Sequence, residues 1–569
     1  MKKFACDFET NTSVDNVNVW AYSICEIGNP NNFIYGNNID DFIKWCSTAH
    51  ENYLLYFHNL KFDGEFIFNY LLSNGYTCIK NKKDKKDKTF TCLISDTGQF
   101  YSIEIYFNLK NKTRPNKVTI YDSLKILNFS VEQIAKNFNL PIRKLDLDYN
   151  TVREEGHVLT PHELDYIRND VEIMARALDI MFNQNLTKMT IASNALAFYK
   201  ELNPNFTHYF PILDYKLDKE IRYSYKGGFT YLNPYYKEKE VGEGLVLDVN
   251  SLYPSVMYNE KLPIGNPIYF DGEYKKDILY PLYIQRISCM FELKKDMIPT
   301  IQIKGSLSFL PNEYLTSSNG DIVSLTLTNV DLELFLKHYD VTFLTYHCGW
   351  KFKGINGLFN KYIDYWTERK INAKKENNSS LYLIAKLMLN SLYGKFGLNP
   401  NVRGKYPCLE DGVIKYHLYD RETRDAIYIP VASFITSYAR RKTIETSQAI
   451  KSYSLEKYGV DMYIYSDTDS IHTTLINEEE LKSFVDIDDY KLGYWKIESK
   501  FTRAKFIRQK CYVEEFNNKL NVTVAGLPKK LSDKVTLDNF KSGFTCNGKL
   551  TFKHVKGGVL LADSPFTIK

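Results

Sequence analysis

The sequence predicts a protein of several domains that mixes helices and strands (α+β). Its 569 residues exceed the usual size of one domain, and a hydrophobic content of 44% can supply more than one core. Short β-rich runs alternate with helical patterns up to about Thr190. A long helical stretch then precedes Phe396, and an acidic hairpin follows it. These features favour an N-terminal α/β domain followed by a larger and less regular part.

Charge and cysteine usage narrow the class of protein. Residues 491–569 contain 16 Lys or Arg and 6 Asp or Glu, a net charge of +10, which leaves −5 for residues 1–490. A basic end beside an acidic body suits a protein that holds a phosphate backbone and binds metals elsewhere, although a solvated charged surface has the same composition. The ten cysteines form no C-x-x-C pair, which is typical of a reducing compartment and predicts neither disulfides nor structural zinc. Acids come too early for a signal peptide and no apolar run could span a bilayer, so we expect a soluble protein without membrane contact.

The first candidate site lies in the N-terminal domain. Phe4–Thr10 predicts a strand in which Asp7 and Glu9 share one face, because side chains alternate along a strand. Asp63 follows a second apolar strand, and Asp170 lies within a helical pattern. Four acids on separate elements can hold two cations about 3.5–4 Å apart, the arrangement that cleaves phosphodiesters.

Two further side chains could assist these acids. Tyr166 lies four residues before Asp170 on the same helix face and could orient a water molecule, and Lys144 could neutralise a phosphate. Taken separately, Asp7 and Glu9 could be an acidic pair on an edge strand, Asp63 a turn residue and Asp170 a charge on a helix surface. Their joint occurrence favours a metal site.

The second candidate site begins at an acidic bend. Tyr465–Ser470 interrupts an apolar run and predicts the tight turn of a β-hairpin, on which Asp467 and Asp469 would need a cation. Mg²⁺ prefers such oxygen ligands and leaves positions for substrate phosphates, although a solvated Asp-rich turn is the alternative. Asp248 ends another apolar strand and is a candidate partner, and Tyr253 follows it closely enough to lie near a sugar.

A helical segment at 385–396 carries a polar stripe. Lys386, Asn390 and Tyr393 lie at i, i+4 and i+7, so they share one face. A cation, an amide and a phenol suit a nucleotide, with the lysine on the phosphates and the ring against the base pair. An ordinary amphipathic helix is the alternative, but a stripe that faces a core would not be Lys-Asn-Tyr.

Two shorter segments fit a nucleic-acid path. Arg508–Tyr512 predicts a strand in which Lys510 and Tyr512 share one face beside a DNA end. Tyr225–Phe229 predicts a turn permitted by its two glycines, with backbone amides that could touch template phosphates.

With these segments in order, the chain resembles the family B DNA polymerases that carry a proofreading exonuclease. DFET, HNLKFDG and YIRND resemble the three exonuclease motifs, and DVNSLYP, KLMLNSLYGKF and YSDTDS resemble polymerase motifs A, B and C. YKGG resembles the motif that links the two activities, and KCY resembles the Lys-x-Tyr motif at the primer end. The resemblance covers the whole chain and is closest to the protein-primed replicases of small tailed Bacillus phages, the phi-twenty-nine type.

The resemblance implies a role for each matching residue. The polymerase metals, two ions of Mg²⁺ or Mn²⁺, would be bound by Asp248, Val249 and Asp469, with Asp467 beside them. The incoming nucleotide would be bound by Tyr253 (which would exclude a ribose 2′-hydroxyl), Lys370, Lys386, Asn390 and Tyr393. A basic position expected one turn before Lys386 is Tyr382, so the lysines that complete the triphosphate site stay open.

The exonuclease and the DNA contacts are implied in the same way. A second pair of ions would be bound by Asp7, Glu9, Asp63 and Asp170, assisted by Tyr166 and Lys144. The frayed single strand would be held by His58, Asn59 and Phe62, partly through stacking. The template would meet Tyr225, Gly227 and Gly228, and the primer end would meet Lys510 and Tyr512.

The spacing between motifs A and B indicates a subgroup of this family. The 133 positions from Tyr253 to Lys386 far exceed an ordinary connection. In protein-primed relatives this interval holds an insertion that contacts the priming protein, and a second insertion helps to enclose DNA and displace the non-template strand. The implied fold is an RNase-H-like exonuclease (1–190), palm (191–259 and 421–524), insertion 1 (260–357, including Asn329–Glu333), fingers (358–397), insertion 2 (398–420) and thumb (525–569).

The resemblance therefore implies a DNA-directed DNA polymerase with 3′→5′ exonuclease activity that initiates on a terminal protein and replicates a viral or plasmid linear genome with strand displacement. Its expected partners are template and primer DNA, dNTPs, the terminal protein and a single-stranded DNA-binding protein. We expect a monomer in the cytoplasm of an infected bacterium. A nucleic-acid-primed repair polymerase and a catalytically inactive DNA-binding scaffold are the alternatives.

Overall fold

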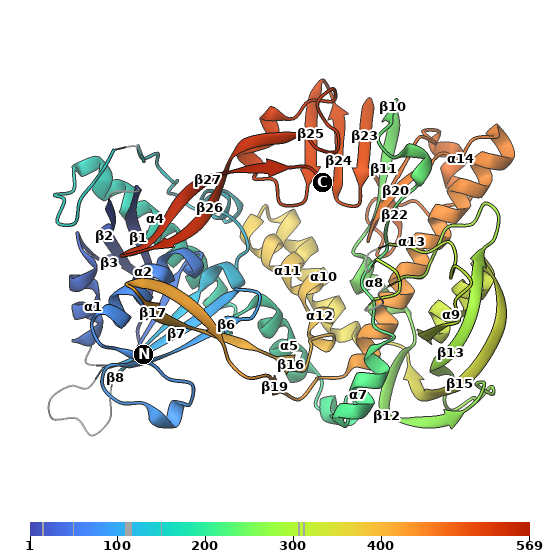
Figure 1. The fold of residues 1–569 in the computed structure, drawn as a ribbon, viewed down its shortest axis with the longest axis horizontal. Helices are drawn as coiled ribbons and strands as arrows, with labels where there is room; N and C mark the ends of the chain where they lie inside the picture. Colours follow the sequence, from blue (N-terminus) through green and yellow to red (C-terminus); the bar gives the residue numbers. More distant parts are fainter. Residues whose placement is uncertain (14–15, 49–50, 108–115, 150, 305–307, 311–312) are drawn as a thin grey trace.

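The computed structural model describes residues 1–569 except 14–15, 49–50, 108–115, 150, 305–307 and 311–312. An N-terminal domain lies at one end, and the strands and helices within residues 230–355 and 429–501 lie at the other, with the helices of residues 360–396 between them (Figure 1). Within the described residues, no helix combines the length and the apolar character that crossing a membrane requires.

The N-terminal domain is built on a mixed sheet with the order β3-β2-β1-β4-β8-β7-β6. β1, β4 and β8 are parallel to one another, and the other pairs along this path are antiparallel. The bounds are β1 Lys3–Ser13, β2 Asn16–Glu26, β3 Asn29–Gly36, β4 Tyr53–Phe57, β5 Thr77–Cys78, β6 Thr89–Ser95, β7 Phe100–Phe107 and β8 Asn116–Asp122. The helices are α1 Ile39–Ser47, α2 Leu60–Ser73, α3 Val131–Asn137 and α4 Pro161–Asn183. The predicted α/β domain, with β1 and α4 at its candidate acids, is confirmed.

A five-stranded antiparallel sheet with the order β22-β11-β21-β20-β9 forms the second centre of the molecule. Its bounds are β9 Thr230–Leu232, β11 Gly244–Val249, β20 Tyr463–Asp467, β21 Ser470–Thr473 and β22 Trp495–Phe501. The predicted hairpin at the acidic bend is therefore confirmed as β20–β21. The long helix α13 Ile429–Tyr458 and the short helix α8 Leu252–Asn259 pack beside this sheet, and α14 is Glu478–Lys482.

Two helices stand between the two sheets. α10 Asn360–Lys375 and α11 Ser379–Ser391 are joined where the sequence turns polar, and the Asn378 side chain accepts a hydrogen bond from the Leu381 amide to begin α11. The prediction of one helix over 385–396 is wrong in one respect, since the chain breaks at Leu392 and a short α12 Tyr393–Phe396 follows. α5 Ile191–Leu202, α6 Phe206–Tyr209 and α7 Tyr215–Arg222 precede β9.

Residues 262–355 form a separate β unit, as expected for an insertion. Its sheet order is β12-β15-β13-β14, with bounds β12 Leu262–Asp271, β13 Leu282–Leu293, β14 Val323–Thr328 and β15 Tyr339–Ile355. α9 Asn329–His338 covers it, and the unit has an apolar core of its own. Asp331 of this helix is buried and paired with Arg440 of α13, so its side chain supports the fold rather than facing a partner, whereas Glu333 is exposed.

The second predicted insertion reaches back to the N-terminal domain. Its strands are β16 Asn401–Val402, β17 Gly404–Glu410, β18 Val413–Leu418 and β19 Glu422–Thr423. β17 pairs with β6, so this hairpin extends the N-terminal sheet, and Ile414 packs into that domain's core.

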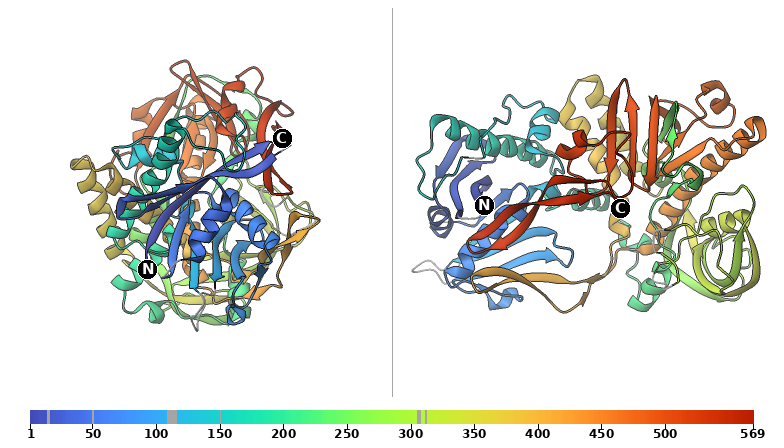
Figure 2. Two further views of the ribbon diagram at one scale, coloured as in Figure 1. Left: turned by 90° about the vertical axis from the view of Figure 1, so that its left-hand side faces the viewer. Right: turned by 45° about the horizontal axis from the view of Figure 1, so that its top comes forward.

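The C-terminal segment also reaches the N-terminal domain. β23 Arg503–Arg508, β24 Cys511–Phe516 and β25 Lys519–Val524 form a sheet with β10 Glu240–Val241, and β26 Thr545–Val555 and β27 Gly558–Thr567 form a long hairpin. This hairpin extends over the N-terminal domain and lies beside the β17–β18 hairpin at α2 (Figure 2), and Val559 joins the core there. The core of the C-terminal segment includes residues from Ile507 onward.

Lys510 does not lie in a strand, contrary to the prediction. It occupies the two-residue turn between β23 and β24 with a φ of 55°, a conformation that neither Gln509 nor Lys510 signals in sequence. Tyr512 lies in β24 as expected.

Candidate functional site

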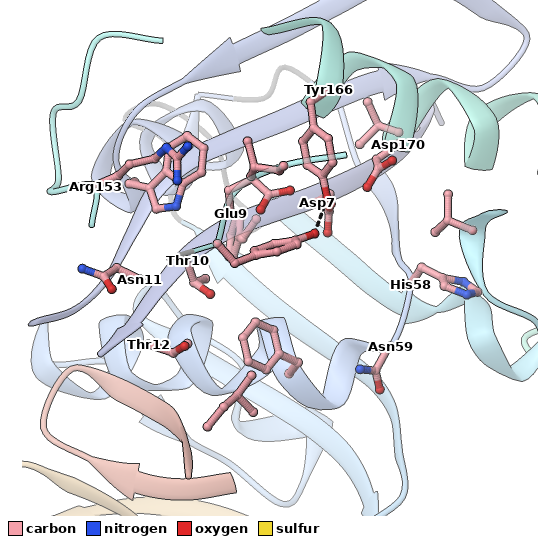
Figure 3. A pocket seen from close by; sticks show the side chains of 18 of the residues that line it. Asp7, Glu9, Thr10, Asn11, Thr12, His58, Asn59, Arg153, Tyr166 and Asp170 are labelled. Atoms are coloured by element: carbon pink, nitrogen blue, oxygen red, sulfur yellow. Dashed lines mark hydrogen bonds between the residues drawn. The ribbon is translucent and has the colours of Figure 1, made fainter. Parts of the chain in front are cut away.

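The first candidate centre forms where β1 meets α4. Side-chain atoms of Asp7, Glu9 and Asp170 lie within 4.8 Å of one another, close enough to hold one cation together. Asp7 and Glu9 project from one face of β1 and Asp170 approaches from α4, as Figure 3 shows. They line a cavity of about 830 Å³.

The electrostatics of this centre fit a divalent cation. Burial and then the charge of Asp170 raise the pKa of Asp7 to about 7, and burial and then Asp7 raise the pKa of Glu9. Among the described residues, the buried Oδ1 of Asp170 has no hydrogen-bond partner. Three crowded carboxylates with an orphaned oxygen are a donor set that a hard cation would neutralise. Mg²⁺ or Mn²⁺ therefore fits here.

The two predicted assisting residues are in place. Lys144 forms an ion pair with Asp170 and donates a hydrogen bond to the Tyr166 hydroxyl, at 3.0 Å. Sequence reasoning missed Tyr149, whose hydroxyl lies 2.6 Å from that of Tyr166. Tyr149 lies outside any regular element, so no periodic pattern points to it.

Asp63 stands slightly apart from this cluster. It is buried in the first turn of α2, and burial and then the charge of Asp7 raise its pKa. It is therefore a neighbour of Asp7, but it does not belong to the three-carboxylate group.

The residues predicted to hold a single strand line the same cavity. His58, Asn59 and Phe62 lie at the start of α2, where Asn59 has a φ of 73° and does not cap the helix with its side chain. Both ring nitrogens of His58 contact protein groups (Ser123 Oγ at 3.0 Å and the Phe129 carbonyl at 2.7 Å), so only its ring face is available to a base.

The middle of the C-terminal hairpin β26–β27 forms part of the wall of this cavity. Leu550, Phe552 and Leu561 line it, and the ring of Phe552 lies 5.8 Å from that of Phe62. The sequence gives no sign of this contact because it joins residues almost 500 positions apart.

The second candidate centre lies on the five-stranded sheet. Asp248 of β11 is opposite Ser470 of β21, and the Val249 amide donates to the Asp469 carbonyl at 2.8 Å. Burial and then the charge of Asp248 raise the pKa of Asp469 to about 6. The half-buried Asp248 and the exposed Asp469 together fit a divalent cation, and Val249 could add only its backbone carbonyl.

Asp467 has different surroundings from Asp469. Lys510 Nζ lies 2.7 and 2.9 Å from its two oxygens, and the Tyr465 hydroxyl donates to it at 3.2 Å. The Lys510 amide in turn donates to the Tyr465 hydroxyl at 2.9 Å. The predicted primer-end residue and the acidic bend are thus brought together, with Asp467 already neutralised.

The predicted nucleotide residues gather over Asp248. The rings of Tyr253 and Tyr393 stack, with centroids 3.9 Å apart. Lys386 and Asn390 are exposed on α11. Burial raises the pKa of Asp248, and the charges of Lys496 and then Lys386 oppose this shift. Burial and then the charge of Lys386 lower the pKa of Lys370, so the two lysines are neighbours.

The predicted turn at 225–229 is irregular, extended chain in which neither glycine has a positive φ. Gly228 is required for a different reason, because a Cβ there would lie 2.7 Å from the Thr468 side chain at the acidic bend. Arg440, which the sequence did not single out, donates to the carbonyls of Lys226 and Gly227 at 2.8 Å.

Among the described residues, one further group could gather around a metal. Cys408, Glu410 and His417 lie on one face of the β17–β18 hairpin, although their spacing suggested no site. His417 already pairs with Glu410 at 2.8 Å and Lys415 faces the group, which disfavours a cation, so we assign none.

Comparisons with known proteins identify the family. The sequence profile described as DNA polymerase type B, organellar and viral, matches residues 45–486. The DNA polymerase of Bacillus phage M2 is 48% identical, and that of Streptococcus phage Cp-1 is 34% identical; each alignment covers 100% of this chain and 98% or more of the relative. The solved structure of Phi29 DNA polymerase with primer-template DNA and incoming nucleotides covers both chains fully at 45% identity, with a TM-score of 0.92. The chain belongs to the type B DNA polymerases and is one of the phi29-type enzymes of this family.

Proposed function

We propose that this DNA polymerase extends DNA at the second centre, removes mismatched 3′ ends at the first, and begins replication on a hydroxyl of a terminal protein. The observation that carries the proposal is the presence of two separate carboxylate centres, Asp7–Glu9–Asp170 and Asp248–Asp469, each with a lysine beside it. The domain limits predicted from sequence remain part of this proposal.

At the synthesis centre, Asp248 and Asp469 would hold two Mg²⁺ ions, for which Mn²⁺ can substitute. When bound, such ions lower the pKa of a coordinated hydroxyl and stabilise charge on the leaving oxygens. Lys370 and Lys386 would bind the triphosphate, and the stacked Tyr253 and Tyr393 would bound the sugar and base pair. Lys510 would leave Asp467 and would then bind the primer end together with Tyr512.

At the degradation centre, Asp7, Glu9, Asp170 and the neighbouring Asp63 would hold the corresponding cations. Tyr166, positioned by Lys144 and Tyr149, would orient the attacking water. The frayed strand would enter the cavity against Asn59, Phe62 and the His58 ring, beneath the C-terminal hairpin. The solved Phi29 polymerase complexed with single-stranded DNA, 44% identical to this chain, supports that use of the fold.

Separate inactivation of the two centres tests this division. Replacing Asp469 with Ala is expected to abolish extension of a primed template and leave degradation of single strands intact. The Asp7→Ala/Glu9→Ala variant is expected to show the reverse. Persistent synthesis in the first variant, or loss of synthesis in the second with its fold intact, would contradict the assignment.

The proposed priming partner is a terminal protein. Residues 262–355 form a unit with an apolar core of its own, which is more than a connection between palm and fingers requires. Incubating the enzyme with the candidate terminal protein, labelled dATP and Mg²⁺ or Mn²⁺ should yield a protein-linked nucleotide. Its absence, alongside normal extension of DNA primers, would favour a nucleic-acid-primed repair polymerase. Any extension of a primed template excludes an inactive scaffold.

The remaining partners follow from the relatives. Structures of Phi29 polymerase contain primer-template DNA and incoming nucleotides, and we assign DNA and dNTPs to this chain as substrates. Strand displacement would involve the β17–β18 hairpin, and a single-stranded DNA-binding protein would cover the displaced strand. We assign the enzyme to the cytoplasm of an infected bacterium, as a monomer.

A further inference from the structure

Three carboxylates of the two candidate centres each contact a lysine. Lys144 pairs with Asp170, Lys510 with Asp467, and Lys496 with Asp248. The first two lysines already have assigned roles toward phosphates or the primer end. Lys496 belongs to no motif and has no assigned role.

The position of Lys496 is fixed by the sheet. β22 runs antiparallel to β11, and Lys496 stands directly opposite Asp248 in the register. Its Nζ lies 3.2 Å from Asp248 Oδ1, and about a third of its side chain (34%) remains exposed. The ammonium group is therefore held at the centre and can still reach a ligand that enters from solvent.

Lys496 adds to a concentration of positive charge. After burial, the charges of Lys386 and Lys496 are the largest influences that lower the pKa of Lys370. Burial lowers the pKa of Lys496, but the nearby Asp248 and then Glu498 raise it, so the ammonium form is favoured. Three ammonium groups around one strand end repel one another unless an anion neutralises them. Asp248 and Glu498 neutralise Lys496 in part, and a bound anion would add to this.

We infer that Lys496 binds the triphosphate of the incoming nucleotide, and the pyrophosphate product, together with Lys370 and Lys386. Once Asp248 is engaged by a cation, its carboxylate no longer neutralises Lys496, and the ammonium group is free to pair with phosphate oxygens. A charge-assisted hydrogen bond of this kind is stronger than a neutral one. The inference rests on the proposed assignment of Asp248 and Lys386 to the nucleotide site.

The test compares Lys496→Met with a matched control on the same strand. Lys500→Met also removes a lysine from β22, but Lys500 pairs with Glu478, outside the two centres. For Lys496→Met we expect about a tenfold rise in KM for dNTP and in the pyrophosphate concentration needed for reversal, with a much smaller change in kcat. Lys496→Arg should restore most of the affinity, and Lys500→Met should match the wild type.

An equilibrium measurement separates binding from turnover. The dNTP affinity of the full chain on a dideoxy-terminated primer-template, measured with Ca²⁺, should fall by the same factor in Lys496→Met. Degradation of single strands and the unfolding temperature report whether the variant is folded. If Lys496→Met is unstable, Lys496→Gln replaces it.

Each possible result of these experiments has one interpretation. Wild-type affinity in folded Lys496→Met, beside weakened binding in Lys386→Ala, would overturn the inference and leave the proposed function standing. A fall in kcat alone would also overturn it, since Lys496 would then act only through Asp248. If Lys386→Ala and Asp248→Ala both left nucleotide binding and synthesis unchanged, the proposed function itself would fail.

Discussion

Asp7 and Asp469 differ from ordinary surface acids because each is partly desolvated beside another carboxylate, although Asp7 is only half-buried and the Asp469 side chain stays exposed. Burial, followed by the neighbouring charge, raises the pKa of Asp7 to about 7 and that of Asp469 to about 6. A metal ligand must be ionised, so protons and cations compete for these side chains in the physiological range.

This competition predicts the pH dependence of the N-terminal centre. The folded-state pKa of Asp7 lies above the value of 3.8 for a free side chain, so the folded protein retains a proton between about pH 4 and pH 7. Mn²⁺ affinity at this centre should therefore fall as the pH drops below 7, by up to about tenfold per pH unit. Calorimetric titration of the Asp469→Ala variant at pH 8, 7 and 6 isolates the centre. Affinity that is the same at all three values would contradict the prediction, and Asp7→Asn should flatten the dependence.

Residue positions were predictable from sequence where a motif also had a local periodicity. Asp7 and Glu9 alternate on a strand, and Tyr166 and Asp170 share a helix face, so their convergence could be expected. Tyr149 and Lys496 could not be found in this way, because each acts through a contact with a distant segment. Gly228 was recognised for the wrong reason. A glycine is required there because a side chain would collide with Thr468, and not because the backbone has a positive φ.

At the scale of elements, a buried hydrogen-bonded pair joins the acidic hairpin to the C-terminal sheet. His472 of β21 and Glu514 of β24 lie 2.7 Å apart with 3% and 4% of their side chains exposed. The rings of Tyr465, Phe506 and Tyr512 pack around His472. The pair therefore holds the strand of Tyr512 against the hairpin that carries Asp467 and Asp469.

Removing one member of this pair should be costly. We expect Glu514→Ala to lower the free energy of unfolding by about 3 kcal/mol, because His472 would keep a buried polar ring without its partner. Glu515→Ala is the matched control, since the neighbouring Glu515 pairs with exposed Arg503 and such pairs contribute at most about 1 kcal/mol. Chemical denaturation of both variants measures the difference. Equal losses would show that the buried pair does not stabilise this junction.

The elements that sequence reasoning misplaced depend on non-local structure. The turn at Gln509-Lys510 carries no Gly, Asn or Asp, and only the strand pairing on both sides reveals it. The break at Leu392 lies among residues of modest or low helix propensity, including Ser391 and Gly394, but the polar stripe of Lys386, Asn390 and Tyr393 continues across it and hides it. The pairing of β17 with β6 joins segments about 310 positions apart, which no local pattern could indicate.

At the scale of the whole molecule, two hairpins meet on the N-terminal domain. The Tyr416 hydroxyl of β18 donates to Glu65 Oε2 at 2.8 Å, and His554 Nε2 of β26 lies 3.2 Å from Glu65 Oε1. The two tips also touch, since Lys556 lies 3.4 Å from the space where Gly412 would carry a Cβ. The second insertion and the C-terminal segment thus form a closed connection between the two halves of the molecule (Figure 2).

This closure predicts a loss of processivity when it is opened. Glu65→Ala removes the carboxylate that both hairpins share, so DNA should dissociate sooner while single-nucleotide insertion continues at its normal rate. Product length after one binding event, measured with a DNA trap, reports the change. Asp563→Asn, at an exposed position of β27, is the control and should leave product length unchanged. Products of wild-type length from Glu65→Ala would show that the closure is not needed.

The central claim is that two separate carboxylate centres hold the metal ions. Anomalous diffraction from crystals of the protein with primer-template, a non-hydrolysable dNTP and Mn²⁺ tests it directly. The account predicts peaks between Asp248 and Asp469 and beside Asp7, Glu9 and Asp170, with Asp467 outside the coordination sphere. Peaks bound by Asp467 in place of Asp469, or none beside Asp7, would contradict it.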